Sequence, residues 1–164
     1  MSSMNFYTTI ASMRSPGTGL GTIYLFPWSI CIVFTLLILV LPVLTGATGI
    51  LVSDICFNTI YMDPAFGGDP VLYQHFFWVF EHPEVYILIV PAFGVLSHVL
   101  AGVAGSIIIY GYPSMVLAMG CISTLGSLVW GHHIYTVGLE ADTRSYFTGL
   151  TVMISLPTGT KLLN

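Results

Sequence analysis

Long apolar stretches separated by short polar segments make up most of this chain. There is no Asp, Glu, Lys or Arg between Arg14 and Asp54, and none between Glu84 and Glu140. A membrane-spanning helix needs about 20 mostly apolar residues, so the first interval has room for one span and the second for two. Asp142 is a good helix N-cap and begins a fourth segment. The predicted spans are residues 22–52, 72–102, 113–130 and 142–164.

The composition supports this prediction. Hydrophobic residues make up 55% of the chain and charged residues only 6%, against roughly 25% charged residues in soluble domains. So few charges cannot cover a soluble surface, and three Lys or Arg cannot hold a nucleic-acid backbone. The three cysteines lie too far apart for a disulfide framework or a zinc site. We therefore expect an all-α membrane protein that contacts lipid and binds no nucleic acid.

The spans are expected to form an up-and-down helical set inside a larger bundle. Pro27 and Pro42 should kink the first span, which membrane helices tolerate when neighbouring groups satisfy the freed backbone atoms. The fourth predicted span has no loop after it, and buried polar groups are costly to leave facing lipid. We therefore expect further spans, supplied by one or more separate chains, to pack around this one.

Polar side chains inside the predicted spans are the candidates for function. An ionisable residue in a membrane span is costly, and each one is a hypothesis for a functional site. In this chain such residues, with nearby hydroxyl groups, gather in the second, third and fourth spans. They are Glu81, His82, Glu84, Tyr86, Ser97, His98, His132, His133, Thr158 and Lys161.

Helical spacing places three of these residues on one face of the second span. His82 and Tyr86 stand at positions i and i+4, which share a helix face. Ser97 lies eleven residues beyond Tyr86, so it returns to within about 20° of that face and lies about 16 Å further along the helix. Glu84 points to a different side.

A metal site is indicated where the second span begins and the third ends. Because these spans are antiparallel, His82, His132 and His133 should meet at one depth. Three neutral imidazoles without a cysteine or carboxylate partner suit copper or zinc. Adjacent histidines cannot share a helix face, so His132 and His133 must ligate from a helix end or a loop, and Gly131 supplies the irregularity.

Simpler interpretations remain open for the same residues. A lone membrane histidine more often makes a hydrogen bond between helices than a metal bond, and this is the interpretation of His75 and His98. Lys161 could extend to the lipid headgroups. Glu84 could be a structural acid and Tyr86 a packing residue, and the aromatic residues of the spans are expected to pack or to lie at the membrane interface. The residues alone indicate an intramembrane metal or proton site.

Three motifs occur in order along the chain: GGDPVLYQHFFWVFEHPEVYILIVPAFGVLSHVL, WGHHIYTVGLEADTRSYFT and SLPTGTK. Together they resemble the central part of subunit I of the haem-copper terminal oxidases, most closely the mitochondrial cytochrome c oxidase type. The resemblance extends from Asn5 to Lys161. It implies that the four spans are the fifth to eighth of a twelve-helix bundle.

The resemblance implies specific roles at the predicted metal site. His82, His132 and His133 are similar in position to the three ligands of the copper at the dioxygen-reducing centre. Tyr86 resembles the tyrosine that is covalently joined to a copper-ligating histidine, here His82. The histidines that ligate the two haems of this family lie outside these spans.

Two proton pathways are implied as well. Glu84 resembles the glutamate that ends one pathway and gates proton pumping. Lys161 and Thr158 resemble members of a second pathway, which reaches Tyr86 past Ser97.

The activity that the resemblance implies is electron transfer from cytochrome c to dioxygen, coupled to proton pumping. The implied location is the mitochondrial inner membrane, with the bacterial plasma membrane as the alternative. Implied partners are other fragments of subunit I, the remaining oxidase subunits and cytochrome c. Alternative functions are a quinol oxidase of the same superfamily and a proton-relay segment of a transporter or channel. An inactive relic is disfavoured because five key positions are intact: His82, Glu84, Tyr86, His132 and His133.

Two residues depart from the family pattern. Glu81 stands before His82 where the family usually has glycine. Its carboxylate could shift the copper potential, pair with a polar group or face outward, and an unedited transcript or a sequence error is also possible. Gly131 stands where many relatives carry alanine, a change expected to be harmless.

Overall fold

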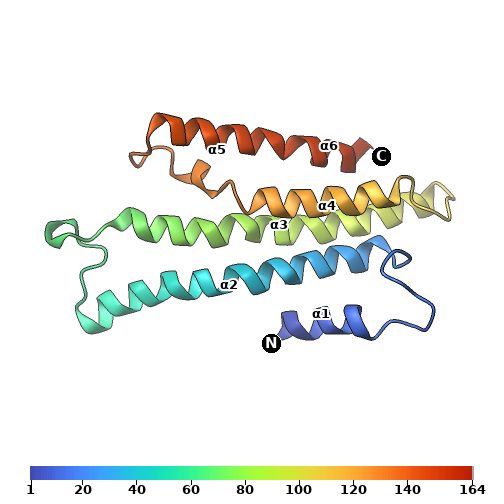
Figure 1. The fold of residues 1–164 in the computed structure, drawn as a ribbon, viewed down its shortest axis with the longest axis horizontal. Coiled ribbons are helices and arrows are strands. Elements are labelled where there is room, and N and C mark those ends of the chain that lie inside the picture. The colour runs from blue at the N-terminus through green and yellow to red at the C-terminus, as the bar shows by residue number, and fades with distance from the viewer. Residues whose placement is uncertain (164) are drawn as a thin grey trace.

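The computed structural model describes residues 1–163, and every regular element in that range is helical. The helices run back and forth along one long axis (Figure 1). In chain order the elements are α1 (Ser2–Ser12), α2 (Leu25–Phe57), η1 (Pro64–Phe66), α3 (Pro70–Val103), α4 (Tyr112–Gly126), η2 (Trp130–Ile134), α5 (Ala141–Met153) and α6 (Ser155–Leu163).

Three segments in the described part of the chain are long and apolar enough to cross a membrane. They are Leu25–Phe57, Pro70–Val103 and Tyr112–Ile134, and they contain or overlap the first three predicted spans. The fourth prediction, residues 142–164, falls on two shorter helices, α5 and α6, which meet at Ile154. Pro157 lies in the first turn of α6, where its missing N–H leaves no helical bond unmade. A continuous fourth span therefore stays a prediction.

The prolines do not end the long helices. Pro27 lies in the first turn of α2, and Pro42 lies inside that helix, which continues to Phe57. Helix α3 likewise continues through Pro83 and Pro91. Its start is well defined, because the Asp69 side chain accepts a hydrogen bond from the backbone N–H of Val71.

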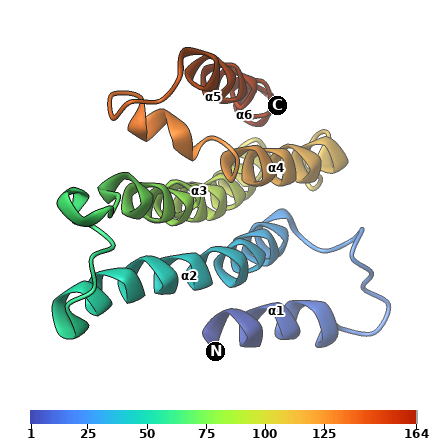
Figure 2. The same ribbon diagram turned by 60° about the vertical axis from the view of Figure 1, so that its left-hand side comes forward.

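The helices are stacked in order, with α1 beside α2, then α3 with α4, then α5 and α6 (Figures 1 and 2). Helices α2 and α3 are antiparallel and share the most extensive interface. The short helix α1 was not predicted from the sequence. The buried apolar core contains Leu25, Val33, Leu36, Val40, Ile87, Val90, Met115, Met119 and Ile122, contributed by α2, α3 and α4.

The loop between α2 and η1 is organised by one carboxylate. Asp54 accepts hydrogen bonds from the Thr59 hydroxyl and from the backbone N–H groups of Tyr61 and Met62. Asn58 ends α2 with a φ of 53°, a left-handed conformation that asparagine tolerates better than most residues. These contacts turn the chain back toward the start of α3.

Candidate metal centre

Three histidines from two elements, α3 and η2, come together in the structure. His82 comes from α3 and is buried at 6% exposure, whereas His132 and His133 come from η2. Potential ligand atoms of the three side chains all lie within 4.8 Å of one another. The prediction that these three histidine side chains come close together is therefore confirmed.

The break after α4 makes this convergence possible. Helix α4 ends at Gly126, and the chain then forms the 3₁₀ helix η2. His132 and His133 are adjacent, and their ring centroids lie 4.2 Å apart. Adjacent side chains on an α-helix diverge by about 100°, so a non-α segment is needed to aim both at His82.

The spacing of the ring nitrogens fits a metal ion. His82 Nδ1 lies 2.9 Å from His133 Nε2. Two ligands at about 2.0–2.1 Å from one metal, with a right angle between them, lie about 2.9 Å apart. The all-imidazole donor set suits copper. The distance between these two nitrogens and the donor chemistry of the cluster therefore fit the copper that the resemblance implies.

Trp78, one of the aromatic residues expected to pack or to lie at the membrane interface, contacts the candidate metal site. Its indole ring stacks on the His133 ring, with centroids 3.9 Å apart and planes 10° from parallel. Trp78 stands four residues before His82, so it shares that face of α3. This i, i+4 relation is the signal that could have predicted it.

Tyr86 lies against the histidine cluster as its spacing predicts. Its ring centroid is 4.8 Å from that of His82. Its ring also packs on Gly126 of α4, where an added Cβ would come within 2.6 Å of the ring. The His82 Nε2 atom is buried without a hydrogen-bond partner among the described residues. Tyr86 is thus held beside a histidine with a free nitrogen.

Lys161 reaches the second span and does not extend to the headgroups. Its side chain is buried at 5% exposure, and its Nζ donates to Ser97 Oγ at 3.0 Å. Thr158 lies one turn earlier, and its hydroxyl donates to the carbonyl of Ile154. The headgroup alternative for Lys161 is therefore wrong in this arrangement. Glu84 lies apart from this contact, and its Oε2 is buried without a partner in residues 1–163.

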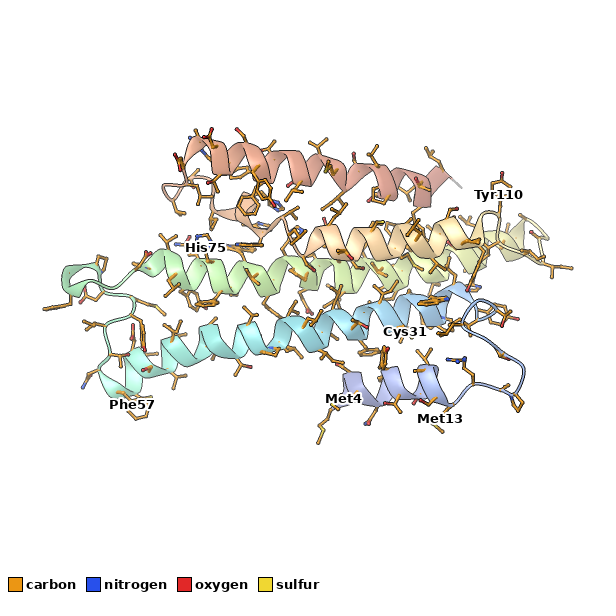
Figure 3. The ribbon with its side chains drawn as sticks, in the orientation of Figure 1. Met4, Met13, Cys31, Phe57, His75 and Tyr110 are labelled. Atoms are coloured by element: carbon orange, nitrogen blue, oxygen red, sulfur yellow. The ribbon has the colours of Figure 1, made fainter. Side chains whose placement is uncertain are left out.

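The two remaining histidines make hydrogen bonds between segments, as predicted. His75, labelled in Figure 3 near the start of α3, accepts a hydrogen bond at Nδ1 from the indole N–H of Trp130, at 3.3 Å. His98 accepts at Nε2 from the backbone N–H of Phe26, at 3.1 Å. The first bond ties α3 to η2, and the second ties it to the N-terminus of α2.

The two departures from the family pattern have different surroundings. Glu81 is half-buried on α3, and its carboxylate has no hydrogen bond or ion pair within the described chain. Gly131 lies against the ring of Phe147, which occupies the space that an alanine methyl would need. Glycine at this position therefore leaves no empty space, and the expectation that it is a harmless replacement of alanine stays a prediction.

The comparison with protein families covers the whole chain. Residues 1–164 match the family described as Cytochrome C and Quinol oxidase polypeptide I. The chain belongs to this family. The resemblance inferred from the motifs is confirmed, as is the prediction of an all-α membrane protein that forms part of the family's helical bundle.

Similar proteins include cytochrome c oxidase subunit 1 of Plasmodium berghei and of Plasmodium falciparum, each 57% identical to this chain. The subunit 1 of Cereibacter sphaeroides is 48% identical. The alignments cover 100% of this chain but only 34%, 34% and 29% of these relatives. The chain therefore spans about a third of their length. The histidine triad of this chain resembles the copper site of the polypeptide I family.

Proposed function

We propose that this chain is the copper-binding part of the catalytic subunit of cytochrome c oxidase. The whole enzyme would transfer electrons from cytochrome c to dioxygen and pump protons across the mitochondrial inner membrane. The observation that carries the proposal is the convergence of three imidazoles from α3 and η2. Other parts of subunit I and the remaining oxidase subunits would complete the enzyme.

In this proposal His82, His132 and His133 would hold one copper ion. The copper would supply one-electron redox chemistry and a binding position for dioxygen. Trp78 supports the proposal because its stacked ring restricts the orientation of His133. The two haems would be ligated by spans elsewhere in the subunit, since His75 and His98 are both engaged in hydrogen bonds.

Tyr86 would hold a proton beside the copper ligands and be joined covalently to His82. The bond would form between a ring carbon of Tyr86 and His82 Nε2 with loss of the hydrogen from each atom, a two-electron oxidation for which dioxygen, the proposed substrate, would be the oxidant. The 4.8 Å separation of the ring centroids and the unpartnered Nε2 of His82 support this pairing. Peptide mass spectrometry of active enzyme is expected to recover the two residues as one linked species. Recovery of both residues unmodified would refute the pairing.

Two separate groups of residues would deliver protons. Lys161 with Thr158 and Ser97 would serve the route that reaches Tyr86, supported by the contact of Lys161 Nζ with Ser97 Oγ. Glu84 would serve the other route. Its carboxylate has a buried oxygen without a partner in the described chain, which leaves that oxygen free to exchange a proton with water or a moving donor.

The test is copper analysis of the intact oxidase. His133→Ala should lose the copper and dioxygen reduction while the haems remain bound. His75→Gln is the matched control, because it changes a histidine of α3 outside the triad and should keep the copper. Full copper occupancy in His133→Ala would overturn the assignment.

The electron donor distinguishes the nearest alternative, a quinol oxidase. The family description includes both classes, whereas the similar proteins reported above are cytochrome c oxidases. Purified enzyme should therefore oxidise reduced cytochrome c and not a quinol. A proton-relay transporter without redox activity would contain neither copper nor haem.

A further inference from the structure

A cavity of about 530 Å³ lies between α1, α2 and α4. Side chains of α2 and α4 form most of its walls, and no histidine of the candidate metal centre lines it. Ligand sites in proteins commonly have volumes of about 300–1,000 Å³. The cavity therefore has the size of a ligand site and is separate from the metal centre.

Small side chains on α4 leave this space open. Gly120, Ser123, Thr124 and Ser127 line it, and a Cβ built on Gly120 would meet no atom within 4 Å. The hydroxyls of Thr124 and Ser127 donate to backbone carbonyls of their own helix, so they have no proton left for a ligand. Ser123 Oγ is buried without a partner in residues 1–163. The α4 wall therefore offers a ligand mostly apolar contacts and one polar atom.

The cavity is about as long as one half of the hydrocarbon core of a bilayer. Along α2 it is lined from Trp28 to Leu39. Eleven helical steps of 1.5 Å span about 16 Å. The hydrocarbon core of a membrane is about 30 Å thick, so the chains of one lipid layer cover about 15 Å of it. A single acyl chain lying along α2 would therefore fill the cavity from end to end.

A cation lies at the end of the cavity near the start of α2, where Arg14, Leu20 and Trp28 line it. The Arg14 Nε and Nη1 atoms donate to backbone carbonyls around the end of α1, whereas Nη2 makes no hydrogen bond within residues 1–163. No Asp or Glu precedes Asp54 in the chain to neutralise this charge. The Trp28 indole N–H donates to the Leu20 carbonyl at 3.0 Å, and tryptophan is typical of the membrane interface. This end of the cavity therefore suits a lipid headgroup.

We propose that the cavity holds one acyl chain of an anionic phospholipid whose phosphate is bound by Arg14. The length and the apolar walls favour an acyl chain. The guanidinium favours an anionic headgroup, because arginine forms strong charge-assisted hydrogen bonds with phosphate. A bulky side chain from a further span would fill the same space but would leave the Arg14 charge without a partner. The inference goes beyond the proposed function and does not depend on copper.

The test counts the phospholipids bound to the purified oxidase complex by native mass spectrometry. The complex is stripped of lipid with detergent and then supplied with phosphatidylglycerol or phosphatidylcholine of the same chain length. Gly120→Leu places a side chain in the cavity and should lower the number of tightly bound phosphatidylglycerol molecules by one. Arg14→Gln should lose the preference of this site for phosphatidylglycerol over phosphatidylcholine. Arg14→Lys keeps the charge and should retain that preference.

Two matched controls lie outside the cavity. Gly46 of α2 also has open space around it, and Arg144 of α5 is a cation that does not line the cavity. Gly46→Leu and Arg144→Gln should bind both lipids as the unaltered complex does.

An unchanged phosphatidylglycerol count in Gly120→Leu would overturn the inference, and would mean that a side chain of a further span occupies the cavity or that it stays empty. Equal losses in Gly120→Leu and Gly46→Leu would overturn it as well. If Gly120→Leu fails to assemble, the two Arg14 variants decide the question. The same lipid preference in Arg14→Gln and Arg14→Lys would contradict a phosphate bound by the Arg14 charge.

Discussion

Glycines of the third span decide how closely aromatic rings approach the histidine cluster. A Cβ at Gly126 would lie 2.6 Å from the ring of Tyr86, closer than packed carbon atoms approach each other. Gly120, on the same helix, has no atom within 4 Å of such a Cβ. Both glycines lie in α4, and only the side chains packed against them in the folded structure distinguish the two positions.

Gly126→Ala should therefore displace the Tyr86 ring from its position beside His82. Overpacking of this kind costs about 1–3 kcal/mol, and we expect slower dioxygen reduction together with a lower thermal midpoint of the complex. Oxygen uptake and thermal unfolding would measure the two effects. Gly120→Ala, with open space around it, should change neither. Full activity in Gly126→Ala would mean that the position of Tyr86 is not critical.

The helices position the side chains proposed to carry protons through contacts between distant parts of the chain. Helix α6 begins after the interruption at Ile154 and carries Lys161 to Ser97 of α3, a separation of 64 residues in sequence. Glu84 lies elsewhere on α3 and takes no part in this contact. The contact of Lys161 with Ser97 therefore does not involve Glu84, and two separate proton routes stay a prediction.

Lys161→Met and Glu84→Gln should consequently give different kinetic defects. Lys161→Met removes the group that contacts Ser97 and should slow reduction of the dioxygen-reducing centre, because electrons cannot enter without a compensating proton. Glu84→Gln should spare that step and block later proton uptake and pumping. Stopped-flow reduction and proton-release measurements would separate the steps. The same defect in both variants would contradict separate roles. Thr160→Val, beside Lys161 but exposed, is the control.

A further prediction concerns the loop after α2, which Asp54 holds in place. Asp54 accepts three hydrogen bonds from the loop, and hydrogen bonds to an ionised acceptor are stronger than those between neutral groups. Asp54→Ala should loosen residues 58–69 and increase protease cleavage there in the intact complex. Asp54→Asn retains one acceptor oxygen and should have an intermediate effect. Unchanged cleavage in the alanine variant would argue that the loop is held by other contacts.

At the scale of the whole molecule, the long helices leave large apolar side chains uncovered. Leu39 of α2 is 66% exposed, Leu88 of α3 is 70% and Leu117 of α4 is 67%. Such surfaces are suited to lipid or to further spans, as expected of a chain that spans about a third of its relatives' length. The haem ligands are accordingly expected on those further spans.

His75→Gln and His98→Gln should therefore leave both haem spectra of the assembled oxidase unchanged. Each histidine accepts one hydrogen bond that ties segments together, so the expected cost is about 1 kcal/mol of stability. Optical difference spectra would measure haem content and ligation. Loss of either haem in one of these variants would place that histidine among the haem ligands and contradict the assignment.

Sequence patterns alone determined the class of protein, the three long spans and the candidate site residues, because apolar length, the scarcity of charge and i, i+4 spacing are local properties. The i, i+4 relation of His82 and Tyr86 needed only the helix period. The likeness to an oxidase subunit was also visible in the order of the motifs.

Tertiary structure decided the features that depend on contacts between distant residues. The burial of Lys161 against Ser97 and the stacking of Trp78 on His133 both arise when separate helices pack. Thr151 of α5 gives a further contact of this kind, because its Oγ1 lies 3.1 Å from His132 Nδ1 of η2. A threonine on an amphipathic helix has no special pattern, and only the docking of α5 on η2 brings its hydroxyl to the nitrogen of His132.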